Sequence, residues 1–206
     1  MKSTPRPSKR SVGRPRAFDR EHALDTALDL FWRYGYNGTS LPQLTAAMGI
    51  SPPSFYAAFG SKETLYRATL QRYLEKYNHF MDGLLDPNTH ARDAIAKGLL
   101  AAAEQFTDPT HAPGCMISSA ELHTTPESQG LAELLTGLRH AAQQWVYDRI
   151  EAARNAGELT ATTDTASLAA YFATIIQGMA IQAHDGADTT TLQHIATLAM
   201  HAWPNG

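Results

Sequence analysis

Glycines and helix-capping serines divide the first third of the chain into short helical segments, and this punctuation restricts the fold more than any other feature. Asp19 is a plausible N-cap, and apolar residues then recur at helical spacing up to Gly35, which can adopt the positive φ that ends a helix. Ser40 caps a second segment, in which Gln43 completes a capping box and Gly49 provides the stop. Each of these stops predicts a turn between two helices.

A third helix is predicted from the N-cap Ser51 to Gly60, with Pro52 at the first helical position, where proline is favoured. Ser61 then caps a longer helix that we expect to reach about Asp82. Three helices within about 42 residues, the last two short and joined by a glycine-containing turn, are typical of a helix-turn-helix unit. In such a unit the N-terminal residues of the final helix meet base edges in the major groove of DNA.

Helical periodicity continues to the end of the chain without strand-like alternation, so the expected fold class is all-α. The further helices are expected at residues 91–106, 115–123, 127–155, 164–186 and 189–203. We divide the chain into four parts. A flexible basic arm (1–16) precedes a helix-turn-helix DNA-binding domain (17–62), and a linking helix (61–82) leads to a C-terminal helical domain (83–206).

Charge is distributed unevenly along the chain. Residues 1–80 contain 12 Lys and Arg against 6 Asp and Glu, whereas residues 90–206 contain 5 against 12. This asymmetry indicates that only the N-terminal part meets a polyanion. We expect arm residues such as Arg14 and Arg16 to follow the DNA backbone or enter the minor groove, the alternative being an arm that only adds solubility.

Composition favours a soluble cytoplasmic protein without membrane contact. No uninterrupted apolar run approaches the roughly 18–20 residues that cross a bilayer. The single cysteine, Cys115, excludes an intrachain disulfide framework and fits a reducing compartment. The sequence has no glycine-rich phosphate loop, H-E-x-x-H or nucleophile elbow, so we expect neither a cofactor nor enzymatic activity.

Two specific motifs lie between GRPRAFD and SKETLYRATL. They are LF…GY.GTS and A..MGIS…FY..F.SKE.L, and with their spacing the segment resembles the tetracycline-repressor (TetR) family of transcriptional regulators. The all-helical remainder also suits that family. The resemblance implies a homodimeric repressor that binds double-stranded operator DNA and is released from it by a small-molecule effector.

The resemblance also implies DNA contacts at the starts of three helices. Thr39 and Ser40 match positions that commonly touch phosphate. Tyr56 matches a tyrosine whose hydroxyl reaches the DNA backbone, and Lys62 matches a lysine that also meets phosphate. Helix N-termini independently favour phosphate, because their first N–H groups are free and the helix dipole is positive there.

The third helix departs from the family pattern at its start. Pro52, Pro53 and Ser54 stand where many relatives carry Lys-Gly-Thr. Prolines have no side-chain donor and also lack a backbone N–H, although they can pack against thymine methyl groups. We therefore expect sparse base readout that rests on Ser51, Ser54 and apolar contacts.

The C-terminal domain is expected to dimerise and to bind the effector. The helix at 164–186 is too apolar on all sides for a surface helix, so it is either a dimer interface, a monomer core, or both on different faces. The candidate dimer residues are Leu168, Phe172, Ile175, Met179, Leu192, Ile195 and Leu198. The candidate effector-pocket residues are Tyr77, Phe80, Met81, Phe106, Met116, Trp145 and Phe172, although aromatic and Met stripes are more often plain core.

Two alternatives to a ligand-responsive repressor remain. The first is a cysteine-based redox or electrophile sensor, because Cys115 is expected at a helix start, where the pKa of a thiol is lowered. Cys115 can also be interpreted as a small buried residue without a sensing role. A protein that binds DNA without sequence preference is a further possibility. His111, Cys115 and His123 lack the tight pairs of a zinc site, and no metal is expected.

Overall fold

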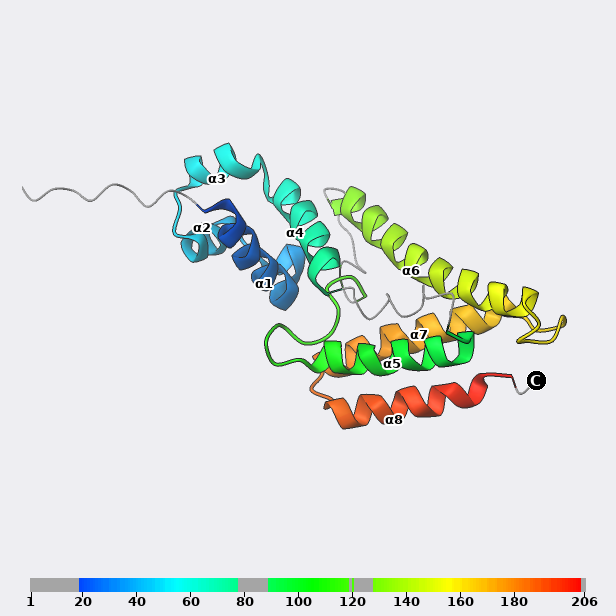
Figure 1. The fold of residues 1–206 in the computed structure, drawn as a ribbon. Coiled ribbons are helices and arrows are strands. Elements are labelled where there is room, and N and C mark those ends of the chain that lie inside the picture. The colour runs from blue at the N-terminus through cyan, green and yellow to red at the C-terminus, as the bar shows by residue number, and fades with distance from the viewer. Residues whose placement is uncertain (1–18, 78–88, 119, 121–127, 205–206) are drawn as a thin grey trace, which may run out of the picture.

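The computed structural model describes residues 19–77, 89–118, 120 and 128–204 (Figure 1). Within these residues the chain forms α-helices and one short 3-10 helix but no strand, which confirms the predicted all-α class. The helices are α1 (Arg20–Gly38), α2 (Leu41–Met48), α3 (Pro52–Phe59), α4 (Lys62–Tyr77), α5 (Ala91–Thr107), α6 (Gln129–Asn155), α7 (Thr165–His184), α8 (Thr189–Ala199) and the 3-10 helix Met200–Ala202.

The helix starts of the N-terminal unit carry the predicted caps. The Asp19 side chain accepts two backbone N–H groups of the first turn of α1, and the Ser51 side chain accepts one from α3. Ser40 and Gln43 form the capping box, in which the Ser40 N–H donates to Gln43 Oε1 at 2.7 Å. Gly35 has a φ of 70° and kinks α1, but helical structure resumes beyond it to Gly38, so the predicted end of this helix is three residues early.

Aromatic side chains fill the core between α1, α3 and α4. The rings of Phe31 and Tyr66 meet edge to face with centroids 5.0 Å apart, and Phe55 and Phe59 of α3 are buried beside them. Ion pairs on the outside also join α1 to α4. Asp25 accepts from Arg72 and from Lys76. The expected extension of α4 to about Asp82 lies outside the described residues.

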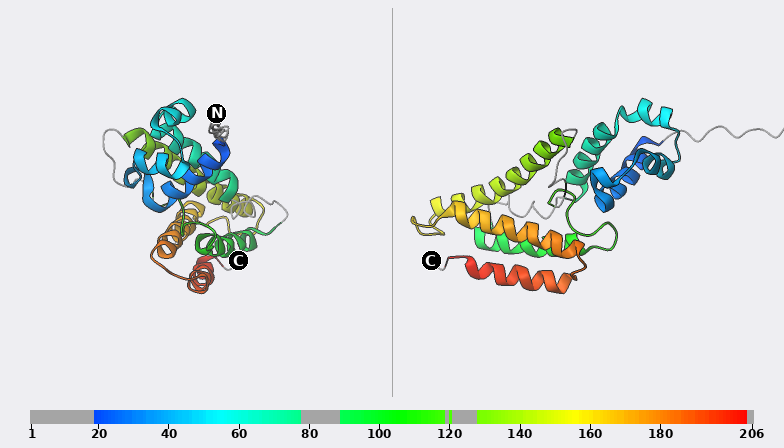
Figure 2. Two further views of the ribbon diagram at one scale, coloured as in Figure 1. Left: turned by 90° about the vertical axis from the view of Figure 1, so that its left-hand side faces the viewer. Right: turned by 180° about the vertical axis from the view of Figure 1, so that it is seen from behind.

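The C-terminal helices form a layered bundle beside this unit. Helices α5, α7 and α8 lie side by side, and α6 crosses α7 diagonally with one end near α4 (Figures 1 and 2). Helix α7 is long and apolar enough to span a membrane by length and composition, but it packs against α5, α6 and α8. Its apolar composition is that of a core helix in this fold.

The predicted helix at 115–123 is wrong for the residues of this segment that the structure describes, because they form turns and a bend. Cys115, Met116 and Ile117 are consecutive and all buried, which one face of a helix cannot achieve. Gly114 precedes them with a φ of 79°, and a Cβ there would lie 2.5 Å from the Ala180 carbonyl oxygen of α7. Close packing on α7 therefore replaces helical structure in this loop.

Candidate DNA-binding surface and internal cavity

The start of α3 presents an uncharged polar and apolar surface to solvent. Ser51, Pro52, Pro53 and Ser54 are all exposed, at an end of the molecule remote from α8 (Figure 1). The Ser51 and Ser54 hydroxyls lie 2.9 Å apart and hydrogen-bond each other, which fixes both side chains at the helix start. The cap thereby orders the two serines expected to read bases.

Tyr56 and Lys62 flank this surface. Tyr56 is 52% exposed, and its ring stands edge-on to the buried ring of Phe55 with centroids 5.6 Å apart. The Lys62 Nζ lies 4.2 Å from the centre of the Tyr36 ring, in cation–π geometry. Aromatic contacts thus hold both side chains in place, and about half of the Tyr56 side chain remains exposed to solvent.

Of the two residues before α2, only Ser40 is exposed. Thr39 is completely buried, and its hydroxyl donates to the Gly35 carbonyl oxygen at 2.8 Å. The Thr39 side chain therefore braces the kink of α1 and is not available to a phosphate at the surface, contrary to the expectation. Arg14 and Arg16 lie outside the described residues.

A partly open cavity of about 260 Å³ lies among the C-terminal helices, and Leu74 of α4 completes its wall. Of the expected pocket residues, Phe106 and Trp145 line it. Met116 and Phe172 are buried but do not line it, and Tyr77 packs instead against Trp32. Phe80 and Met81 lie outside the described residues. The lining residues are Leu74, Phe106, Cys115, Ile117, Ser118, Leu138, Arg139, Ala141, Ala142, Gln143, Trp145, Val146, Ala173, Ile176 and Gln177.

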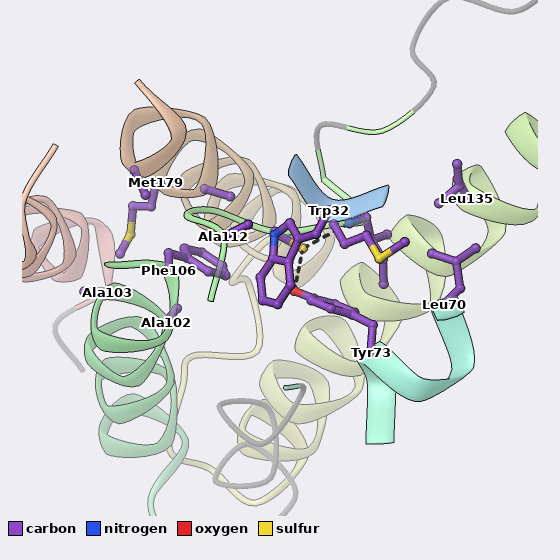
Figure 3. Packing of buried hydrophobic residues seen from close by; sticks show 14 of the residues in the cluster. Trp32, Leu70, Tyr73, Ala102, Ala103, Phe106, Ala112, Leu135 and Met179 are labelled. Atoms are coloured by element: carbon purple, nitrogen blue, oxygen red, sulfur yellow. Dashed lines mark hydrogen bonds between the residues drawn. The ribbon is translucent and has the colours of Figure 1, made fainter. Parts of the chain in front are cut away.

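A chain of contacts connects this cavity to the N-terminal unit. The Tyr73 hydroxyl of α4 donates to Cys115 Sγ at 3.3 Å, and the Ile117 N–H approaches the same sulfur at 3.4 Å (Figure 3). Burial raises the pKa of Tyr73 well above its usual value, so the phenol keeps the proton that it donates. Trp32 of α1 packs edge-on against Tyr73, with ring centroids 4.9 Å apart. Cys115 at the cavity wall is thereby two contacts from α1.

Arg139 of α6 is the functional candidate that the sequence interpretation missed. Its Nη1 donates to the Ile117 carbonyl oxygen at 3.1 Å and to that of Ala120 at 3.4 Å. Burial lowers the pKa of its guanidinium, which nevertheless stays protonated at neutral pH. Its position along the helix could have identified it from the sequence. Arg139 follows Leu135 by four residues and precedes Val146 by seven, so it lies on the same face of α6 as these two buried residues.

The outer side of α7 and α8 only partly matches the expected dimer residues. Phe172, Met179 and Leu192 are fully buried within the protomer, so their assignment to an interface is wrong and the core interpretation holds for them. Leu168, Ile175 and Ile195 are partly exposed, and Leu198 is 63% exposed. Tyr171 and Ile181 are further exposed apolar side chains on α7.

Acidic, histidine and cysteine side chains do not gather into a metal-binding group within the described ranges. His111 hydrogen-bonds through Nδ1 to the Ala112 carbonyl oxygen and stacks on Trp32, with ring centroids 4.4 Å apart. His123 lies outside the described residues.

Known proteins resemble the chain over nearly its whole length. Residues 23–69 match the family described as bacterial regulatory proteins, tetR family. The chain is 37% identical over 198 residues to the HTH-type transcriptional repressor ComR of Escherichia coli (strain K12), covering 95% of this chain and 94% of ComR. It is 29% identical over 193 residues to the transcriptional repressor BdcR of the same strain, covering 94% and 93%.

A solved structure extends this similarity to three dimensions. A cysteine mutant of the TetR family transcriptional regulator CifR, in complex with 26bp double-strand operator DNA, has a TM-score of 0.87 and 40% sequence identity to this chain. The similarity covers 93% of this chain and 100% of that one. The chain therefore belongs to the TetR family of bacterial regulatory proteins, which are DNA-binding transcriptional regulators and not enzymes.

Proposed function

We propose that this protein is a homodimeric, cytoplasmic repressor that binds a defined operator through α3. The observation that carries the proposal is the exposed, capped start of α3, where Ser51 and Ser54 stand beside Tyr56 on a helix anchored by Phe55. A helix of this kind fits the major groove and leaves its N-terminal residues against base edges. ComR and BdcR are named repressors, and CifR was solved on operator DNA, which supports the same role here.

We further propose that a small molecule in the cavity lowers operator affinity. The cavity is mostly apolar, and its wall reaches the N-terminal unit through the contact from Cys115 to Tyr73 and Trp32. An effector that favours a different position of α4 changes the spacing of the two recognition helices in a dimer. Its effect on DNA affinity cannot exceed the difference in its affinity for the two conformations.

Fluorescence anisotropy with labelled duplexes tests this function. The protein is titrated onto the DNA upstream of its own gene and onto a shuffled duplex of equal length, at several salt concentrations. We expect at least about a hundredfold preference for one upstream fragment at physiological salt. Equal affinity for every upstream fragment and for shuffled DNA would contradict a sequence-specific regulator.

A second candidate is a repressor whose signal is covalent modification of Cys115. The supporting observation is that Cys115 lines the cavity and that its Sγ accepts from two donors, the Tyr73 hydroxyl and the Ile117 N–H. These two donors hold the sulfur in one position on the cavity wall. A small electrophile that enters the cavity would therefore meet this sulfur, whereas a purely packed thiol would stay inert.

Treatment with N-ethylmaleimide distinguishes a sensing role of Cys115 from a packing role. Addition forms an Sγ–C bond to the maleimide ring, and the thiol proton ends on the neighbouring ring carbon. If Cys115 is a sensor, treatment lowers operator affinity of the wild-type protein and leaves a Cys115→Ser variant unaffected. Unchanged operator affinity after treatment, with no mass increase on Cys115, supports the packing role instead.

A further inference from the structure

Arg139 is the only charged side chain among the described residues that line the cavity. The other lining residues are neutral, and most are apolar, from Leu74 of α4 and Phe106 of α5 to Ile176 of α7. Small-molecule sites typically combine an apolar wall with a few polar groups that orient the ligand. A single cation in such a wall favours a ligand with negative charge.

Arg139 has no carboxylate partner in the part of the chain that the structure describes. Its hydrogen bonds go to neutral acceptors, namely the carbonyl oxygens of Ile117 and Ala120 through Nη1 and the Thr136 hydroxyl through Nη2 at 3.0 Å. A guanidinium has five N–H donors, so the Nε–H and one N–H of Nη2 meet no acceptor among these residues. A partly buried charge without a counter-ion is costly, and a bound anion would remove that cost.

The unused donors are those that hold a carboxylate elsewhere in this molecule. Arg72 binds both oxygens of Asp25 through the same two atoms, with Nε at 3.0 Å from Oδ1 and Nη2 at 3.2 Å from Oδ2. Bidentate pairs of this kind are strong and orient the carboxylate in the guanidinium plane. Arg139 can offer the same edge to a carboxylate that the protein itself does not supply in its described part.

The cavity volume limits the size of such a ligand. A dry apolar cavity of about 150 Å³ accommodates benzene, with its six carbon atoms. In proportion, the 260 Å³ cavity holds about ten non-hydrogen atoms. Gln143 and Gln177 also line the cavity, and each supplies an amide that can orient further polar atoms of the ligand.

We propose that the cavity selects a small organic acid, whose carboxylate lies on the Nε–Nη2 edge of Arg139. The apolar body of the acid packs against Phe106, Leu138 and Ile176. This inference rests on the proposed function for its regulatory meaning, since the occupant of this cavity is the proposed effector. It assigns that effector to a chemical class and makes Arg139 the specificity-determining residue.

Calorimetric titration of the full chain with a matched pair of ligands tests the proposal. The probes are 3-phenylpropanoate and its neutral amide, which share one shape and differ in charge. We expect the wild-type protein to bind the acid at least about tenfold more tightly than the amide, because charge-assisted bidentate hydrogen bonds are stronger than neutral ones. In Arg139→Gln this preference disappears, while Arg139→Lys retains part of it.

Arg92→Gln, an equal charge change at an exposed position on α5, should leave the preference unchanged. Because Arg139 also holds the loop at Ile117, the Gln variant can lose affinity for both probes. In that case the Arg139→Lys variant is the informative one, and a retained preference for the acid over the amide supports the proposal. The proposal is overturned if the wild-type protein binds the acid no better than the amide, binds neither, or keeps its preference in Arg139→Gln.

Operator affinity, measured with and without each probe, separates this proposal from the proposed function. If an acid binds through Arg139 but leaves operator affinity unchanged, the proposed release from DNA is wrong, while the assignment of the ligand as an organic acid holds. If a neutral ligand releases the DNA and Arg139 is not needed, the release mechanism holds and the assignment of the ligand as an organic acid is wrong.

Discussion

Single side chains determine how α3 can meet DNA. No charged residue lies between Ser51 and Ser61, so attraction to phosphate has to come from helix N-termini, the Tyr56 hydroxyl and Lys62. The exposed Ser54 is held by the cap, and in the proposed complex its hydroxyl would face the groove. Phosphate contacts place the helix, whereas base contacts select the sequence, and these residues divide between the two tasks.

The Tyr56→Phe substitution tests the phosphate role of the hydroxyl. The ring packs on Phe55, so the variant should fold normally and lose only the polar end. We expect affinity to fall about fivefold, corresponding to about 1 kcal/mol, for operator and random duplexes alike. Anisotropy titrations on both duplexes measure this change.

The matched control is Tyr147→Phe, which removes a hydroxyl on α6, away from α3, and should leave DNA affinity unchanged. Ser54→Ala provides the contrast, since it should alter preference at particular base positions. A loss confined to operator DNA in Tyr56→Phe would show that Tyr56 reads sequence and does not hold phosphate.

At the scale of elements, local signals and long-range packing account for different parts of the fold. The caps at Asp19, Ser40 and Ser51 are properties of neighbouring residues, and the sequence was sufficient to place the helices that they start. The loop after Gly114 could not be predicted in this way, because the contact with Ala180 of α7 determines its path. The helix expected to start at Cys115 is therefore absent from the described part of this segment.

Gly114→Ala is expected to destabilise this loop strongly. The new Cβ would approach the Ala180 carbonyl oxygen to 2.5 Å at a φ of 79°, which is unfavourable for any residue with a side chain. We expect the free energy of unfolding to fall by about 2 kcal/mol or more, measured by chemical denaturation. Gly137→Ala in α6 has no atom within 4 Å and should instead gain about 0.5–1 kcal/mol. Equal stability of the two variants would contradict this packing.

The ion pairs between α1 and α4 predict a pH dependence. Hydrogen bonding to Arg72, with a further contribution from Lys76, holds the pKa of Asp25 below its usual value. A carboxyl group with a lowered folded-state pKa stabilises the fold above its unfolded pKa of about 3.9, and this stabilisation is lost as the pH falls through the lower folded value. The side chain is 38% exposed, so we expect at most about 1 kcal/mol at pH 7.

Denaturation of the wild-type protein and of Asp25→Asn, across the pH range 2 to 7, measures this effect by difference. The variant should be less stable at pH 7, and the two curves should converge well below pH 4. A constant difference at all pH values would show that the loss comes from packing and not from the charge.

At the scale of the whole molecule, the proposed function requires two copies of the chain. Adjacent major grooves recur about 34–36 Å apart, so a dimer has to hold its two copies of α3 at that spacing. Helical periodicity predicted the apolar character of α7, but it could not separate core from surface faces without knowing which neighbours cover them. Cavity formation is equally non-local, since its lining comes from four helices and the loop at Cys115.

Leu198→Glu tests the proposed dimer surface on α7 and α8. Leu198 is 63% exposed on α8, and a carboxylate at this position would lose its hydration if a second copy covered it. We expect sedimentation to show a shift from dimer towards monomer, with operator affinity falling in parallel. Tyr34→Glu, at a similarly exposed position in the DNA-binding half, should leave the oligomeric state unchanged. A fully dimeric Leu198→Glu protein would place the interface elsewhere.

A nuclease footprint on the DNA upstream of the gene tests the central claim most directly. We predict one protected site with two-fold symmetry, whose half-sites are centred about one or two helical turns apart. Hydroxyl-radical cleavage should show each half-site protected across one face of the major groove. Uniform weak protection along the fragment, without a symmetric site at any protein concentration, would contradict sequence-specific recognition through α3.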